Sequence, residues 1–214
     1  MKSITQSITR HTFLLLSLHL LLAGCASTSM ERSDDARTTM QTVENDIQRI
    51  VVQLDATGQS LDNLVNFNQT DVKKAFDEFA ANVEKIEKME KSFSAHADKM
   101  QARGKEYFAE WKKEGTTYDN PDIQALSDQR RDELGTAYGR IAQSGVSVKS
   151  AFKTYVSDVQ EIRTFLSTDL TSKGIDAIVE VSRRSVRDGT NLKYAIKNMQ
   201  GVIESVKDEM AQTR

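Results

Sequence analysis

Apolar residues recur at alternating spacings of three and four along most of this chain, in four stretches separated by short polar breaks. Periodicity of seven residues puts these side chains on one stripe of a helix, and it predicts coiled-coil-like packing against partner helices. The first stretch shows it in Met40, Val43, Ile47, Ile50, Leu54, Leu61 and Leu64, if Thr57 fills the one remaining position. No stretch alternates apolar and polar residues between turn signals, so nothing indicates β-strands.

The repeat continues through three further stretches. The second consists of Val72, Phe76, Phe79, Val83, Ile86, Glu90, Phe93, Ala97, Met100, Gly104, Tyr107 and Trp111. The third consists of Leu134, Tyr138, Ile141, Gly145, Val148, Phe152, Tyr155, Val159, Ile162 and Leu166. The fourth consists of Ile175, Ile178, Ser182, Ser185, Gly189, Leu192, Ile196, Met199, Ile203, Val206 and Met210. Small and polar residues make the middle of the fourth stretch its weakest part.

Turn and capping residues mark the breaks, at residues 66–70 and 168–172 and at Asn120 with Pro121. Proline disfavours helical geometry in the residue before it and suits the first turn of a new helix. Short connections between long helices favour antiparallel neighbours. The expected fold is therefore all-α, an elongated antiparallel helical bundle or coiled coil of about four long helices over residues 36–212.

Two glycines occupy stripe positions in the last two stretches. Counted from the break near Asp169, Gly145 and Gly189 are expected at nearly the same level of neighbouring helices. Either the helices approach closely there, or both glycines are tolerated independently. On the first interpretation, Gly189→Leu would separate the helices and lower the melting temperature.

The first 24 residues have the organisation of a secretory signal. Lys2 and Arg10 are positive and no acid accompanies them, and residues 13–22 form an apolar run with two polar interruptions. That run is too short to cross about 30 Å of hydrocarbon, which takes about 20 apolar residues. We expect residues 1–24 to be removed as a signal peptide.

A lipobox follows directly, formed by Leu22, Ala23, Gly24 and Cys25, and it holds the only cysteine of the chain. Small residues before the cysteine let a signal peptidase approach the backbone, and the thiol of Cys25 would accept a diacylglycerol. An ordinary signal peptide with a coincidental cysteine is the alternative. A single cysteine cannot form an intramolecular disulfide, so Cys25 has no competing structural role in an oxidising compartment.

The arrangement around Cys25 resembles that of triacylated bacterial lipoproteins. Each buried methylene of an acyl chain such as palmitate contributes about 0.8 kcal/mol, so several chains anchor firmly. Ala26 stands where an aspartate would, in that class, favour retention in the inner membrane. The resemblance implies the periplasmic face of the outer membrane. Residues 25–35 are expected to form a flexible lipidated tether, with Ser33, Asp34 and Asp35 capping the first helix.

Charge and residue types exclude several classes of function. Residues 1–24 carry two positive charges and no negative one, so their removal moves the formal net charge from −2 to −4, which gives no footprint for nucleic acid. His96 is the only histidine after the signal and has no cysteine to complete a metal site. Phosphate-binding glycine loops and strand–turn–helix nucleophile motifs are absent. We expect no catalytic residue, no metal and no cofactor.

Two clusters are candidates for contact with a partner or ligand. Tyr107, Phe108 and Trp111 form the densest aromatic group, and they either plug one end of the bundle or line a groove. The second cluster is basic and contains Arg183, Arg184 and Arg187. It is either a solvated helix face or a contact for an acidic partner or anionic lipid headgroups.

The lipobox, the helical pattern and two segments together resemble a family of bacterial lipoproteins with a domain of unknown function, DUF2959. The segments are Tyr107-Phe108-Ala109-Glu110-Trp111-Lys112-Lys113-Glu114 and Phe165-Leu166-Ser167-Thr168-Asp169-Leu170. The resemblance covers nearly the whole chain after the signal. It implies fold and location, and it brings no activity, substrate or catalytic residue.

The hypothesis that these observations favour is a non-enzymatic, lipid-anchored scaffold or adaptor on the periplasmic side of the outer membrane. Its expected partners are the membrane, through the lipid on Cys25, and an envelope protein or a second copy of the chain bound through incompletely buried stripes. The alternative is a periplasmic binding module or chaperone-like carrier. Its hydrophobic groove would lie near Trp111 or at the thin middle of the last helix.

Overall fold

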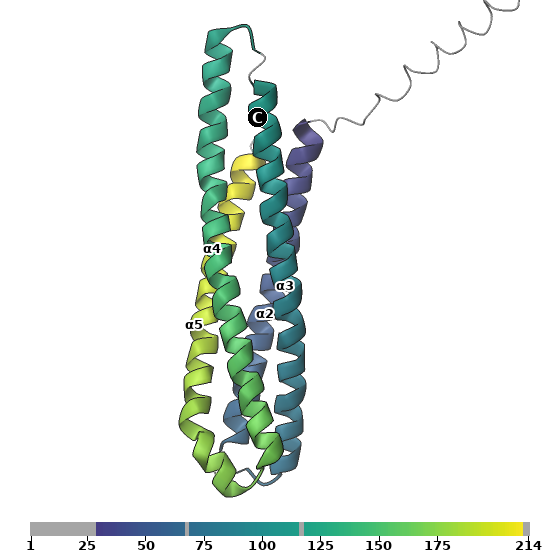
Figure 1. The fold of residues 1–214 in the computed structure, drawn as a ribbon, viewed down its shortest axis with the longest axis vertical. Coiled ribbons are helices and arrows are strands. Elements are labelled where there is room, and N and C mark those ends of the chain that lie inside the picture. The colour runs from purple at the N-terminus through teal and green to yellow at the C-terminus, as the bar shows by residue number, and fades with distance from the viewer. Residues whose placement is uncertain (1–28, 67–68, 116–117, 212–214) are drawn as a thin grey trace, which may run out of the picture.

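A computed structural model describes residues 29–66, 69–115 and 118–211 of the chain (Figure 1). The described residues form four long helices: α2 (Ser29–Leu64), α3 (Val72–Gly115), α4 (Pro121–Thr168) and α5 (Ser172–Ala211). The predicted signal peptide and Cys25 lie outside these residues. At 1.5 Å per residue, the 48 residues of α4 span about 72 Å.

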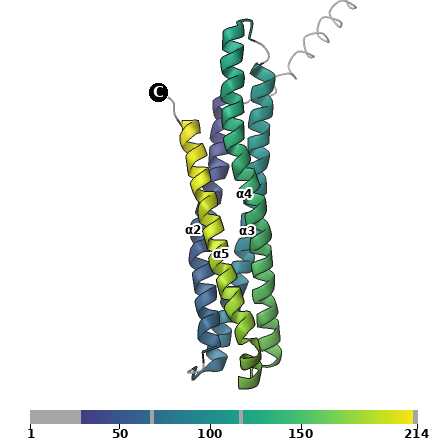
Figure 2. The same cartoon turned by 90° about the vertical axis from the view of Figure 1, so that its left-hand side faces the viewer.

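The four helices run up, down, up and down, each beside the next in sequence (Figures 1 and 2). Packing contacts join α2 to α3, α3 to α4, α4 to α5 and α5 back to α2. The bundle is therefore closed into a ring of four neighbours. The expected all-α, elongated antiparallel bundle is confirmed. None of the described helices is both long and apolar enough to cross a membrane.

The core follows the predicted stripes closely. Every stripe residue of α2 is buried, and Thr57, which fills the gap in the repeat, is 0% exposed. In α4 all ten stripe residues are buried, and in α5 only Met210 at the end is not. In α3 the stripe is buried from Phe79 to Gly104, except at Glu90. The local seven-residue repeat thus predicts nearly the whole core.

The predicted tether was too long at its helical end. Residues 29–35 form the first two turns of α2, where the sequence indicated a polar linker capped at Ser33. Arg32 forms an ion pair with Glu114 in the last turn of α3, which brings these polar turns against the bundle. Tertiary packing therefore extends the helix beyond the apolar stripe that marked it in the sequence.

Side-chain caps fix the helix starts that the turn residues predicted. The Asn120 side chain accepts hydrogen bonds from the backbone of Asp122 and Ile123, at 2.9 and 3.4 Å, and Pro121 begins α4. At the start of α5 the Thr171 hydroxyl accepts from Gly174 N at 3.2 Å. These bonds satisfy backbone donors that a helix leaves unpaired at its start.

The two stripe glycines lie at different levels of the bundle, so the expected alignment was wrong. A Cβ atom at Gly145 would lie 3.5 Å from Met199, whereas one at Gly189 would lie 2.8 Å from the Tyr155 ring. Tyr155 lies about ten residues, or about 15 Å, further along α4 than Gly145. The register that α4 and α5 adopt through their whole length decides which residues face each other.

Candidate functional site

The four helices do not end together at the end of the bundle where α2 begins, which we call the open end. Arg130 of α4 donates a hydrogen bond to the Glu209 carbonyl in the last turn of α5, at 2.8 Å. Because α5 ends two residues later, at Ala211, about seven residues of α4, or about 10 Å, extend beyond the described end of α5. Figure 2 shows α5 stopping short of α3 and α4 at this end. One side of the bundle interior is consequently less covered there.

Tyr107, Phe108, Trp111 and Tyr138 pack together at the open end and form the aromatic cluster. The Tyr107 ring lies edge-on to Phe108 and Trp111, with centroids 5.1 and 5.6 Å apart. Phe108 stacks on Trp111 at 6.5 Å and lies edge-on to Tyr138 at 5.6 Å. The Trp111 indole donates to the Ser127 hydroxyl at 3.1 Å, which ties α3 to α4. The predicted plug is thus present, and Tyr107, Phe108 and Trp111 remain only partly buried.

A pocket of about 500 Å³, the open-end pocket, lies beside two of these rings. Tyr107 and Trp111 form one wall, and Met30 and Met210 add apolar surface from α2 and α5. Burial raises the pKa of the Tyr107 phenol, so its neutral form is favoured. The aromatic group therefore plugs the bundle and also lines a hollow, and the two interpretations of the sequence are compatible.

The polar lining of the open-end pocket comes from the first turns of α2. Arg32 and Glu114 form an ion pair at its edge, and Arg37 lies 3.6 Å from Asp34. An amphipathic molecule with an apolar body and a polar end would meet both kinds of surface here. Pockets that bind small molecules commonly combine a largely apolar lining with a few polar groups.

The basic cluster lies on the exposed face of α5, where Arg183, Arg184 and Arg187 are all exposed. Arg183 forms an ion pair with Glu180 at 2.6 Å. Burial raises the pKa of Asp62 on α2, and the positive charge of Arg183 partly offsets that rise. Arg183 therefore faces the α2 side. Arg187, one turn later, is exposed.

Arg184 lies on the same exposed face of α5, near Asp158 of α4. Burial raises the pKa of Asp158, and the negative charges of Asp188 and Glu161 raise it further. The positive charge of Arg184 lowers this pKa. The surroundings of Arg184 are therefore acidic. The three arginines are exposed and acidic side chains stand near two of them, which is compatible with the solvated-face interpretation for this cluster.

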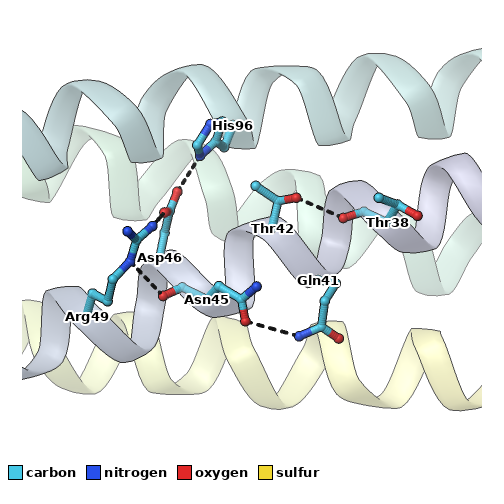
Figure 3. A network of polar contacts seen from close by, with 7 residues as sticks. All are labelled: Thr38, Gln41, Thr42, Asn45, Asp46, Arg49 and His96. Carbon is cyan, nitrogen blue, oxygen red and sulfur yellow. Dashed lines mark hydrogen bonds and ion pairs between the residues drawn. The ribbon is translucent and has the colours of Figure 1, made fainter.

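A buried polar network between α2 and α3 was not predicted from the sequence. Asp46, whose side chain is 4% exposed, lies 2.6 Å from His96 Nδ1 and accepts from Arg49 at 2.5 Å (Figure 3). His96 itself lies at the edge of the bundle with 40% of its side chain exposed. Asp46 stands beside Ile47 of the α2 stripe, which is the only sequence signal of its burial.

Glu44 is the second buried acid on α2. Its Oε2 accepts from Lys207 of α5 at 2.5 Å, while its buried Oε1 has no hydrogen-bond partner among the described residues. Both acids therefore serve contacts between helices. Within residues 29–66, 69–115 and 118–211, no group of three or more histidine, cysteine or acidic side chains is placed to hold a metal ion.

Comparison with known proteins identifies the family. Residues 29–212 match the family model described as "Protein of unknown function (DUF2959)". No curated protein matches the chain, and no solved structure does. The matched segment begins at the first residue of α2 and includes the four helices, the aromatic cluster and the open-end pocket. The chain therefore belongs to the DUF2959 family.

Proposed function

We propose that this protein is a non-enzymatic, lipid-anchored scaffold or adaptor on the periplasmic side of the bacterial outer membrane. The lipobox ending at Cys25 carries the anchoring part of the proposal. The closed four-helix core carries the scaffold part, because a rod about 72 Å long can hold a partner well away from the membrane surface.

The observation that supports the proposal most directly is the start of α2 at Ser29. Only residues 26–28 separate this helix from Cys25. α2 packs against both α3 and α5, so a force on its first turn is transmitted to the whole bundle. A lipid on Cys25 would therefore hold a stiff rod by its open end, and several acyl chains supply enough buried methylenes for stable anchoring.

Substitution of the lipobox cysteine tests the anchor. Cys25→Ser is expected to lose incorporation of labelled palmitate and to leave the outer-membrane fraction, whereas the matched neighbour Ser27→Ala keeps both. Ala26→Asp is expected to keep the lipid and to shift the protein to the inner membrane. A Cys25→Ser protein that is processed at its signal and still fractionates with the outer membrane would contradict the proposal.

The open-end pocket favours a second candidate, a binding module for a hydrophobic ligand or client. Its volume of about 500 Å³ lies within the usual range of small-molecule pockets, about 300–1,000 Å³. The other groove considered, at the thin middle of α5, is filled, because the Tyr155 ring packs on Gly189 and both Ser182 and Ser185 are buried.

Fluorescence of the single tryptophan distinguishes the two candidates. Trp111 lines the pocket, so a bound fatty acid or lysolipid is expected to shift or quench its emission in a saturable manner. Met210→Trp in a Trp111→Phe background reports on the opposite wall. A flat titration in both proteins, with fatty acid and with an unfolded client, would leave the scaffold as the better explanation.

A further inference from the structure

Large apolar side chains are exposed at the open end more densely than elsewhere on the described surface. Leu126 is 66% exposed and Met30 is 69% exposed, and Tyr118 and Ile123 are also exposed. All four lie where α2 begins and where α3 passes into α4. The other exposed large apolar residues are spread along the rod, and they are Val52, Val146, Phe165, Val181 and Tyr194.

The geometry of α4 explains why these side chains lack neighbours. Ile123 and Leu126 are three residues apart in the first turns of α4 and so lie on one face of the helix. These turns extend past the described end of α5, as the contact between Arg130 and Glu209 shows. Isolated exposed leucines are common, but a group at one end of a long molecule calls for an explanation.

The short distance in sequence between Cys25 and the start of α2 indicates what covers the exposed apolar group. Cys25 precedes Ser29 by four residues, a span of at most about 14 Å for an extended chain. If Cys25 is lipidated, which is the proposed function on which this inference rests, the first turn of α2 stays within that distance of the bilayer. The exposed apolar group then faces the bilayer and not the periplasm.

The side-chain chemistry suits the boundary between lipid headgroups and acyl chains. Tyrosine combines an apolar ring with a polar hydroxyl and is common at that depth, and Leu, Ile and Met supply the apolar surface that inserts. Acidic Asp119 and Asp122 stand beside the group, so attraction to anionic lipid is not its main source of binding. Unpaired backbone donors at the start of α4 would oppose insertion into an apolar layer. The Asn120 side chain accepts hydrogen bonds from two of these donors.

We propose that Tyr118, Ile123 and Leu126, together with Met30, insert into the headgroup region of the bilayer that holds the lipid of Cys25. The lipid gives one attachment point and the apolar group gives a second, on a different helix. Two points fix the direction of a stiff rod, whereas one lipidated linker leaves it free to tilt. The contact therefore sets the bundle upright, with its α4–α5 turn directed into the periplasm.

Spin labels on the mature lipidated protein test this contact directly. Lipidation blocks the thiol of Cys25, so one introduced cysteine can be labelled, at Leu126→Cys or at the matched position Val146→Cys on the same helix. The protein is reconstituted into vesicles of phosphatidylethanolamine and phosphatidylglycerol at a low protein-to-lipid ratio. Collision rates with oxygen and with a water-soluble nickel complex are then measured.

The ratio of the oxygen collision rate to the nickel collision rate is expected to be several times higher for the label at residue 126 than for the label at residue 146. This difference is expected to persist at high salt. Equal accessibility of the two labels would overturn the inference. Dipolar broadening at residue 126 without increased oxygen contact would overturn it in favour of a second copy of the chain. Spin labelling of the parent protein, which has no introduced cysteine, would show a free thiol at Cys25 and contradict the lipid anchor. The parent protein therefore tests the anchor, and the two cysteine variants test the membrane contact.

Discussion

At the scale of single residues, two tyrosine rings of α4 pack directly against glycines of neighbouring helices. We call the space that each glycine leaves for a ring a socket. The Tyr138 ring occupies the space that a Cβ atom of Gly104 on α3 would take, and its hydroxyl donates to the Met100 carbonyl. The Tyr155 ring packs on Gly189 of α5 in the same way. Burial raises the pKa of both phenols, so the neutral rings are the packed form. Small stripe residues are thus paired with large ones across the helix contacts.

Gly104→Ala is expected to lower the free energy of unfolding by about 1–3 kcal/mol, because the new methyl group displaces the Tyr138 ring. Gly139→Ala is the matched control, since a Cβ atom there meets nothing within 4 Å. That control is expected to gain about 0.5–1 kcal/mol, because alanine favours the helix over glycine. Urea denaturation followed by circular dichroism measures both, and equal effects of the two substitutions would contradict the socket.

Glu44 is buried whereas its partner Lys207 is partly exposed, and this difference leads to an asymmetric prediction. Lys207→Met leaves the Glu44 carboxylate buried without its partner and is expected to cost about 3 kcal/mol of stability. Glu44→Met removes the buried charge, with its unpartnered Oε1, and is expected to be neutral or slightly stabilising. The two single variants are compared by thermal and urea denaturation. Equal losses in both variants would show that the pair itself is strongly stabilising.

At the scale of elements, the first turns of α4 project past α5, as the end of α3 does (Figure 2). Those turns bury little apolar surface, and Ile123 and Leu126 are exposed. Their helical form therefore depends on local features, the Asn120 cap and Pro121 in the first turn. The remainder of α4, from Leu134 onward, is held by the shared core.

Asn120→Ala is accordingly expected to destabilise the first turns of α4 by about 1 kcal/mol without lowering global stability by as much. Amide hydrogen exchange measured by mass spectrometry should show faster exchange in residues 118–132 only. Asn120→Asp keeps an acceptor at the cap and is expected to exchange like the parent protein. Unchanged exchange in the alanine variant would mean that tertiary contacts, and not the cap, hold this segment.

At the scale of the whole molecule, the apolar stripes of all four helices meet in one core. From the sequence alone, self-association is proposed through stripes that a single chain leaves incompletely buried. In the structure the stripes are buried within one chain over almost their whole length. A second copy would therefore have to bind another surface.

We expect the unlipidated mature chain to be a monomer in solution, with the high frictional ratio of a rod about 72 Å long. Sedimentation velocity over a wide range of protein concentrations measures both properties. A sedimentation coefficient that rises with concentration would contradict the prediction. Repeating the run with Leu126→Asp would then show whether the open end forms the contact.

Local periodicity and capping residues predict the four helices of the described residues, the breaks between them and nearly every core residue. The lipid anchor at Cys25 stays a prediction from the same kind of local signal. The packing of the helices against one another continues α2 through residues 29–35, sets Gly145 and Gly189 at different levels, and leaves α5 short of α4. The same packing buries Asp46 and Glu44 beside the stripe. These features depend on the relative lengths and register of helices distant in sequence, and no local pattern encodes them.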